Sequence, residues 1–202
     1  MASEVDICNL ALAHLGDEAT VASIEPPEGS AQAEHCARFY PIARDALLEM
    51  HPWKFATRRA MLAPQVTAAW NWAYAYAEPA GAVRLLSVLA ADAPAQAETQ
   101  PFEAQATDTG AAIILTNLPS ASLLYVSRLT DTAKFSPLFV DALGWLLASH
   151  LAGPILKGEA GSAMAKDCLR QFMLSLSNAK TSNANQQMAR QEHTAPWITA
   201  RG

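Results

Sequence analysis

The sequence predicts an α+β protein in which an α-helical bundle of about four helices carries a β-rich insertion and ends in an extended C-terminal tail. Two stretches with helical apolar spacing come before residue 52, and two more follow residue 131. Between them large residues alternate with small or polar ones, which is typical of strands. We therefore expect a helical domain of residues 1–52 and 131–180, an inserted β-rich domain of residues 53–130, and a tail of residues 181–202.

The two N-terminal helices are predicted from their end signals. Ser3 and Asp6 have the form of a capping box, and Gly16 ends the helix that they open. A second helix is expected from about Ser30 to Met50. Pro41 lies inside it and should kink it, because proline removes one helical hydrogen bond and clashes with the preceding turn.

A basic and aromatic stretch marks the change from helix to strand. The second helix must end near Pro52, because the residue before a proline is disfavoured in the α region. Residues 53–57 alternate as a strand does, which would place Lys54 and Arg58 on the same face. Together with Arg59 they form a basic cluster with two interpretations. It is either a solvated face, or a contact with an acidic neighbouring subunit or with the phosphates of passing DNA.

The middle of the chain should be β structure. One strand is expected to place four aromatic rings on a single face, those of Trp70, Trp72, Tyr74 and Tyr76. A buried sheet core explains this ladder better than stacking on sugars or bases, since no basic residue lies between positions 65 and 83. Further strands are expected at Val83–Leu89, Phe102–Ala106, Ile113–Thr116 and Ser122–Leu129, with a mobile loop at 90–100.

Two further helices follow the predicted insertion. Ser136-Pro137 supplies an N-cap and a proline at the first helical position. The helix from Leu138 to Leu151 is apolar nearly all round and should end at Gly153-Pro154. Such a helix must be buried on several sides, in the core or against another subunit. A fourth helix is expected at about Glu159–Lys180.

The tail after Lys180 loses helical periodicity and turns polar, apart from one apolar group. We interpret this apolar group as an anchor that docks on a partner; the alternative is that it folds back on its own subunit. The candidate docking residues are Arg190, His193, Pro196, Trp197 and Ile198.

Composition narrows the function. The formal net charge of −5 argues against a protein that wraps nucleic acid through a broad basic surface. Cys8, Cys36 and Cys168 fall on apolar helical stripes, which predicts buried thiols in a reducing cytoplasm. The N-terminus lacks a secretion signal, and we expect no apolar run of membrane-spanning length, hence a soluble cytoplasmic product.

No enzyme motif is found in the sequence, so we predict no catalytic, cofactor or metal residues. His14 and His51 lie near helix C-termini, where the helix dipole favours a histidine without a catalytic role. A metal site at His35 and Cys36 is disfavoured, since adjacent residues on a helix diverge in direction. A carboxylate pair for glycoside hydrolysis stays open, because such pairs are defined only in space.

Three stretches, HPWKFATRR, WNWAYAYAEPAG and YVSRLTDTAKFSPLFVDAL, occur in this order along the chain. In order and spacing they resemble the head-to-tail adaptor family of tailed bacteriophages, which includes the tail tubular protein A of short-tailed phages. The resemblance implies an α-helical bundle with a β-rich insertion and no catalysis. It also implies a homo-oligomeric ring, twelvefold in that family, beneath the portal protein.

That family closes the packaged head and offers a platform to the tail or nozzle protein. The resemblance therefore implies a place at the virion neck, after synthesis in the host bacterial cytoplasm, with the C-terminal tail on the portal and no membrane partner. Genomic DNA would pass through an acidic channel without sequence-specific binding, which agrees with the negative charge. The alternative function is an envelope-glycan hydrolase carried in the phage tail, an activity sometimes attributed to tail tubular proteins.

Overall fold

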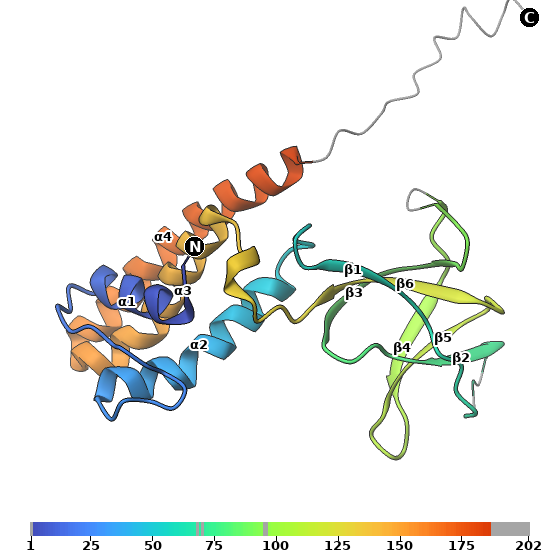
Figure 1. The fold of residues 1–202 in the computed structure, drawn as a ribbon, viewed down its shortest axis with the longest axis horizontal. Coiled ribbons are helices and arrows are strands. Elements are labelled where there is room, and N and C mark those ends of the chain that lie inside the picture. Colours follow the sequence, from blue (N-terminus) through green and yellow to red (C-terminus); the bar gives the residue numbers. More distant parts are fainter. Residues whose placement is uncertain (1, 68, 70, 95–96, 187–202) are drawn as a thin grey trace, which may run out of the picture.

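The computed structural model describes residues 2–67, 69, 71–94 and 97–186. It has the mixed α+β architecture predicted from the sequence. The described chain forms an elongated molecule with a helical body at one end and a β body at the other (Figure 1). The helical body consists of α1 (Glu4–His14), α2 (Ala31–Glu49), α3 (Pro137–Leu156) and α4 (Gly158–Asn185).

The first two helices form as their end signals predict. The Ser3 hydroxyl accepts a hydrogen bond from the Asp6 amide, and the Asp6 carboxylate accepts one from the Ser3 amide, so the capping box is confirmed. Gly16 follows with a φ of 74°, a left-handed conformation that glycine adopts without strain. In α2, Pro41 lies within the helix as expected, and Ser30 caps its N-terminus.

Six described strands form two small antiparallel sheets. The first has the order β1-β6-β3, with β1 at Thr57–Met61, β6 at Ala121–Ser127 and β3 at Ala82–Ala90. The second has the order β2-β5-β4, with β2 at Tyr74–Ala77, β5 at Ala112–Thr116 and β4 at Phe102–Ala106. The predicted β4–β5 hairpin is confirmed, with Gly110 at a φ of 81° in its turn.

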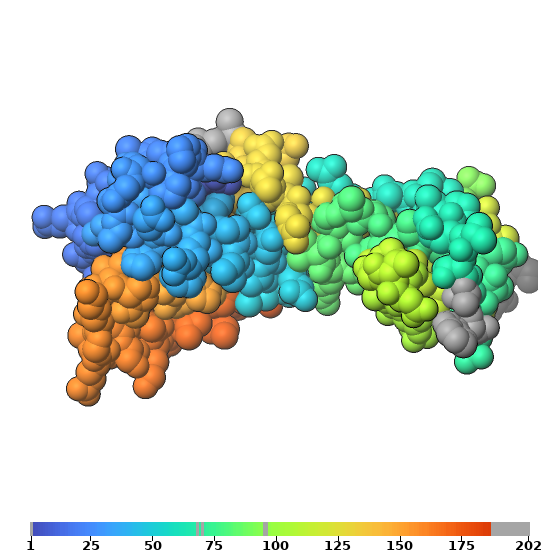
Figure 2. Space-filling model, turned by 90° about the horizontal axis from the view of Figure 1, so that it is seen from below, coloured from blue at the N-terminus to red at the C-terminus, as the bar shows by residue number. Residues whose placement is uncertain are grey.

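The helical and β bodies are joined by a continuous apolar core. Val126 and Leu129 are buried in the same cluster as the helical residues, and Val83 and Leu86 pack against that cluster. A second cluster joins the two sheets through Tyr76, Val88 and Leu123. The end-to-end arrangement of the two bodies along the long axis is also seen in Figure 2.

The prediction of a strand at residues 53–57 is wrong. The amides of Ala56 and Thr57 both donate to the Trp53 carbonyl, at 3.0 and 2.8 Å, so this segment is a turn and β1 begins only at Thr57. The physical reason is the Trp53 side chain, which is fully buried in the helical core. Lys54 and Arg58 therefore do not share one face of a strand.

The four-ring aromatic ladder is also wrong. Trp72 precedes β2 in a bend, and its indole Nε1 donates to Glu103 Oε2 at 3.1 Å. Trp72 packs with Leu115, whereas Tyr76 enters the core shared by the two sheets. The bend changes the side on which the ring lies, which a period of two cannot anticipate. Trp70 lies outside the described residues.

The third helix runs past its expected end at Gly153-Pro154 and reaches Leu156. A proline this close to a helix C-terminus removes one hydrogen bond only, and the Lys157 amide still donates to the Gly153 carbonyl. The expectation of no span-length apolar run is wrong as well, since α3 meets the length and composition of a membrane-crossing helix. Its apolar residues serve the bundle core, because Leu143, Leu147 and Leu151 are fully buried there.

The fourth helix continues to Asn185, so the tail does not begin at residue 181. Ala179 and Asn183 are buried, and the Thr181 hydroxyl donates to the Ser177 carbonyl at 3.0 Å within the helix. Tertiary packing thus extends a helix into a stretch whose sequence is polar. Residues 187–202 of the predicted tail lie outside the described residues.

The close contact of α3 with α4 depends on Gly161. A Cβ atom added at Gly161 would lie 2.8 Å from the carbonyl oxygen of Ala152, a backbone atom that cannot move aside easily. We expect Gly161→Ala to lower the free energy of unfolding by about 1–3 kcal/mol, because overpacking outweighs the gain in helix propensity. Urea denaturation measures it, with Gly153→Ala as the control.

A Cβ at Gly153 would meet nothing within 4 Å. The control should therefore be neutral or slightly stabilising. Equal stability of the two variants would show that α3 and α4 do not meet as closely as the structure places them.

Candidate functional site

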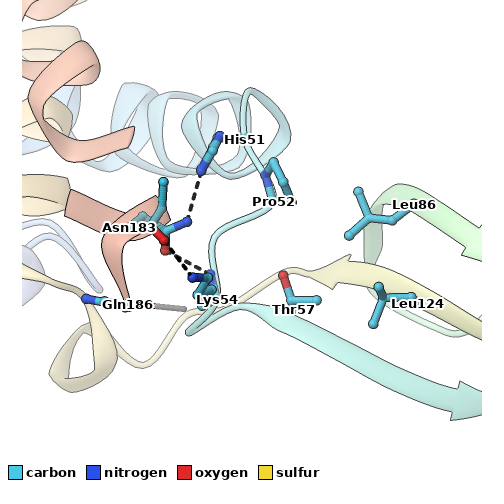
Figure 3. Close-up of a pocket in the computed structure, with 9 residues that line it drawn as sticks. His51, Pro52, Lys54, Thr57, Leu86, Leu124, Asn183 and Gln186 are labelled. Carbon is cyan, nitrogen blue, oxygen red and sulfur yellow. Dashed lines mark hydrogen bonds between the residues drawn. The ribbon is translucent and has the colours of Figure 1, made fainter. Parts of the chain in front are cut away.

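A groove of about 550 Å³ lies where the helical body meets the β body. Three parts of the chain form it: the segment after α2, strands β3 and β6, and the end of α4. In Figure 3 the two leucines from the strands lie across from the residues of the α4 end. The lining residues are His51, Pro52, Lys54, Thr57, Leu86, Leu124, Asn183, Ala184 and Gln186.

Asn183 fastens the end of α4 to the segment that follows α2. Its Oδ1 accepts a hydrogen bond from the backbone amide of Lys54 at 3.0 Å, and its Nδ2 lies 2.9 Å from Nε2 of His51 (Figure 3). The Lys54 ammonium donates to the Ala184 carbonyl at 3.2 Å, which satisfies one of the last carbonyls of α4. The three bonds hold one wall of the groove in place.

This network determines the protonation of His51. A backbone N–H can only donate, so the Asn183 atom that faces Lys54 N must be the oxygen, and the amide nitrogen must face the imidazole. Because Nδ2 is a donor, Nε2 of His51 must accept. The ring is therefore neutral and carries its proton on Nδ1. A second proton on Nε2 would place two donors against each other.

The electrostatic surroundings favour the same neutral ring. Burial is the main cause that lowers the pKa of His51, and the positive charges of Lys180, Arg84 and Lys54 lower it further. None of the nine lining residues carries a carboxylate. The groove is thus locally positive on a chain whose formal net charge is −5.

Trp53 ties the groove to the helical core. Its indole Nε1 donates to the Leu47 carbonyl at 2.8 Å, so the polar atom of this buried ring is satisfied. Its ring meets Phe139 edge-on at a centroid distance of 5.0 Å and His51 at 4.8 Å. His51 therefore rests against a side chain that cannot move without disturbing the core.

The predicted basic cluster is not brought together. Lys54 lines the groove, Arg58 is exposed in β1, and Arg59 binds within the β body. The Arg59 guanidinium donates to the Ser122 hydroxyl at 2.9 Å and to carbonyls of the segment after β3, at Ala90, Ala91 and Ala93. Arg84 and Lys180, the other cations near His51, were missed, because no local pattern links positions so far apart.

A second hollow of about 320 Å³ lies in the helical body. Glu4 and Glu25 both line it, so two carboxylates converge here that the sequence could not place together. Tyr40 lines it as well, and its buried hydroxyl has no hydrogen-bond partner among the described residues. Burial raises the pKa of Tyr40, which keeps the hydroxyl protonated. Arg44 completes the polar set, with its guanidinium 5.8 Å from the centre of the Tyr40 ring.

The three cysteines are buried in the core, and His14, His35 and His150 are half-buried in the helical body. His14 stacks on Trp145 at 3.6 Å, and burial lowers the pKa of His14, so this histidine is neutral rather than a charged partner of the helix dipole. In the described ranges no three side chains of metal-ligating type converge, and His35 and Cys36 find no third ligand there. The three cysteines are buried and unpaired, as predicted.

The candidate docking residues of the tail, Arg190, His193, Pro196, Trp197 and Ile198, all lie outside the described residues. No protein-family model matches the sequence, and a comparison with curated proteins finds no match.

Proposed function

We propose that the chain is a structural head-to-tail adaptor of a tailed phage, which forms a ring under the portal, seals the packaged head and carries the tail or nozzle protein. The observation that carries this proposal is that two unlike bodies share one continuous apolar core. An adaptor must present one surface to the head and another to the tail. Two unlike bodies joined by a shared apolar core suit that role, and the Asn183 network fastens α4 to the segment that leads from α2 into the β body.

The outer face of α4 supports self-association. Leu169 and Met173 lie one helical turn apart, with exposures of 41% and 60%, and Leu174 beside them is 59% exposed. Apolar side chains gathered in this way suit a contact between subunits better than a surface in water. In the proposed ring this face meets a neighbouring subunit, and twelve subunits would match the phage family that the sequence resembles.

The tail remains part of the proposal. The last described residue, Gln186, lines the junction groove, and the segment with Trp197 follows it. We place this segment on the portal, where burial of one indole can dominate a small contact. The formal charge of −5 fits a channel wall along which DNA slides without being held.

The test is the mass of the purified chain, alone and mixed with a portal ring, followed by electron microscopy. A monomer that becomes a ring on the portal is the expected result. Trp197→Ala should weaken attachment, while Met188→Ala, a change in the same segment, should not. A chain that stays monomeric and never joins the portal would remove the adaptor role.

One observation favours the hydrolase alternative. Glu4 and Glu25 line one hollow beside the protonated Tyr40, and paired carboxylates are what glycoside hydrolysis requires. A hollow of about 320 Å³ is nevertheless small for a glycan chain. Glu4→Gln and Glu25→Gln should each abolish any envelope-glycan cleavage under this alternative, with the exposed Glu18→Gln as control. Activity that survives both substitutions would exclude this pair as the catalytic groups.

A further inference from the structure

We propose that the junction groove binds an acidic segment of a partner protein that inserts an apolar side chain between the two bodies. The inference rests on the proposed role as an interaction protein and names the chemistry of the partner at one site. Three features of the groove carry it: its charge, its apolar wall and the free donors at its rim.

Charge comes first. The cations that act on His51 come from three different elements: Lys54 from the segment after α2, Arg84 from β3 and Lys180 from α4. No lining residue offsets them with a carboxylate. Positive charge that acts on a hollow of an acidic protein attracts an acidic partner and orients it.

Two of the cations that act on His51, Lys54 and Arg84, keep donors for such a partner. The Lys54 ammonium has three donors, of which one is used on the Ala184 carbonyl. One Arg84 Nη1 donor is used on the Glu49 carbonyl at 3.1 Å, and the guanidinium has further N–H groups. Both side chains donate to a carbonyl at a helix end, which restrains them before a partner arrives and lowers the entropy lost on binding.

The apolar wall of the groove favours a ligand that carries an apolar side chain as well as negative charge, as a peptide can. Leu86 and Leu124 line the groove opposite the polar network, and Pro52 lines it beside His51 (Figure 3). A volume of about 550 Å³ falls within the usual range of ligand pockets and admits a few side chains. An acidic segment with one large apolar residue would meet both walls at once.

Two other occupants fit less well. The chain's own residues 187–202 carry Arg190 and Arg201 against Glu192, so this segment shares the sign of the rim. Nucleic acid would need cations repeated along a track, together with stacking side chains. Here Lys54 lines one hollow with an aliphatic wall, and the charges of Arg84 and Lys180 act on His51 in the same hollow.

The experiment selects a library of short random peptides on the immobilised full-length chain, and then measures the affinity of synthetic versions by fluorescence anisotropy. We expect enrichment of peptides that combine Asp or Glu with one large apolar residue. Their affinity should fall about tenfold in Lys54→Gln, which corresponds to about 1.4 kcal/mol, and it should weaken with added salt. Lys180→Gln tests the same charge without touching the Lys54 network.

Arg58→Gln is the matched control, because Arg58 is exposed in β1 and does not line the groove. Circular dichroism confirms that each variant is folded. Peptides without acidic residues, or an equal loss in Arg58→Gln, would overturn the proposal. So would a single-stranded oligonucleotide that binds the groove while no acidic peptide is enriched.

Failure of this inference is separable from failure of the adaptor role. If the chain assembles on the portal but no acidic peptide binds the groove, only the partner chemistry is wrong. If acidic peptides bind at Lys54 while the portal is ignored, the groove stands and the adaptor role falls.

Discussion

Replacing Trp53 by alanine should lower the free energy of unfolding by about 3–5 kcal/mol, the largest effect expected of any single substitution discussed for this chain. The side chain is fully buried, and it meets the rings of Phe139 and His51 at 5.0 and 4.8 Å. Alanine would leave a cavity among residues that come from three different segments. It would also free the Leu47 carbonyl, which accepts from the indole nitrogen.

Urea denaturation measures this change, and Trp72→Ala is the control. Trp72 belongs to the small cluster of the second sheet and is only partly buried. The same truncation there should therefore cost much less. Trp53→Phe keeps most of the apolar contact but loses the bond to Leu47, so its stability should lie between those of the wild type and Trp53→Ala. Equal losses at Trp53 and Trp72 would contradict the central place of Trp53.

Trp53 also shows why local patterns have a limit. Residues 53–57 alternate as a strand does, yet the ring is drawn into the helical core and the backbone turns. Large and small side chains do alternate in this segment, but the alternation indicates only their size and not where each of them is buried. The end of α4 fails for the same reason, because Asn183 is held by residues more than a hundred positions away.

The features that the sequence predicted correctly are those decided by neighbouring residues. The Ser3–Asp6 capping box, the Ser136-Pro137 start of α3 and the β4–β5 turn at Gly110 are all complete within a few positions. Their physical causes act over one helical turn or one hairpin. Tertiary packing therefore has little power to change them.

The junction groove could not be predicted in this way. Of its lining residues only Lys54 is predicted from the sequence as a contact residue, and then as part of a strand with Arg58 and Arg59. His51 and Pro52 are noted there only as signals of a helix end. Leu86, Leu124 and Asn183 carry no signal of a shared site, since they lie on elements that meet only after folding. The pair of Glu4 and Glu25 was left open for the same reason and appears only in the folded chain.

Replacing Asn183 by alanine should lower the free energy of unfolding by about 2–4 kcal/mol, the second largest effect expected. Asn183 is only 6% exposed, and its amide serves the Lys54 amide and His51 together. Alanine would leave both groups in a partly buried place without a partner, and each unsatisfied group costs about 1–3 kcal/mol. Asn178→Ala, an exposed position on the same helix, controls for helix propensity and should change little.

Asn183→Asp tests the charge state of His51. In the wild type the pKa of His51 is lowered, so the unfolded chain binds the proton more tightly than the folded chain. Its contribution to stability is therefore present above the unfolded value of about 6.5 and is lost as the pH falls through the lower folded value. An aspartate would still accept from the Lys54 amide, but its negative charge would favour the charged ring.

The pKa of His51 should then rise, and the sign of its contribution should reverse. Stability from this pair would be present below about pH 6.5 and lost as the pH rises through the new folded value. Urea denaturation of both chains between about pH 5 and 8 measures the difference, with Asn178→Asp as control. His14 and His150, whose pKa values burial also lowers, contribute equally to both chains and cancel. Parallel pH profiles would show that Asn183 does not hold His51 neutral.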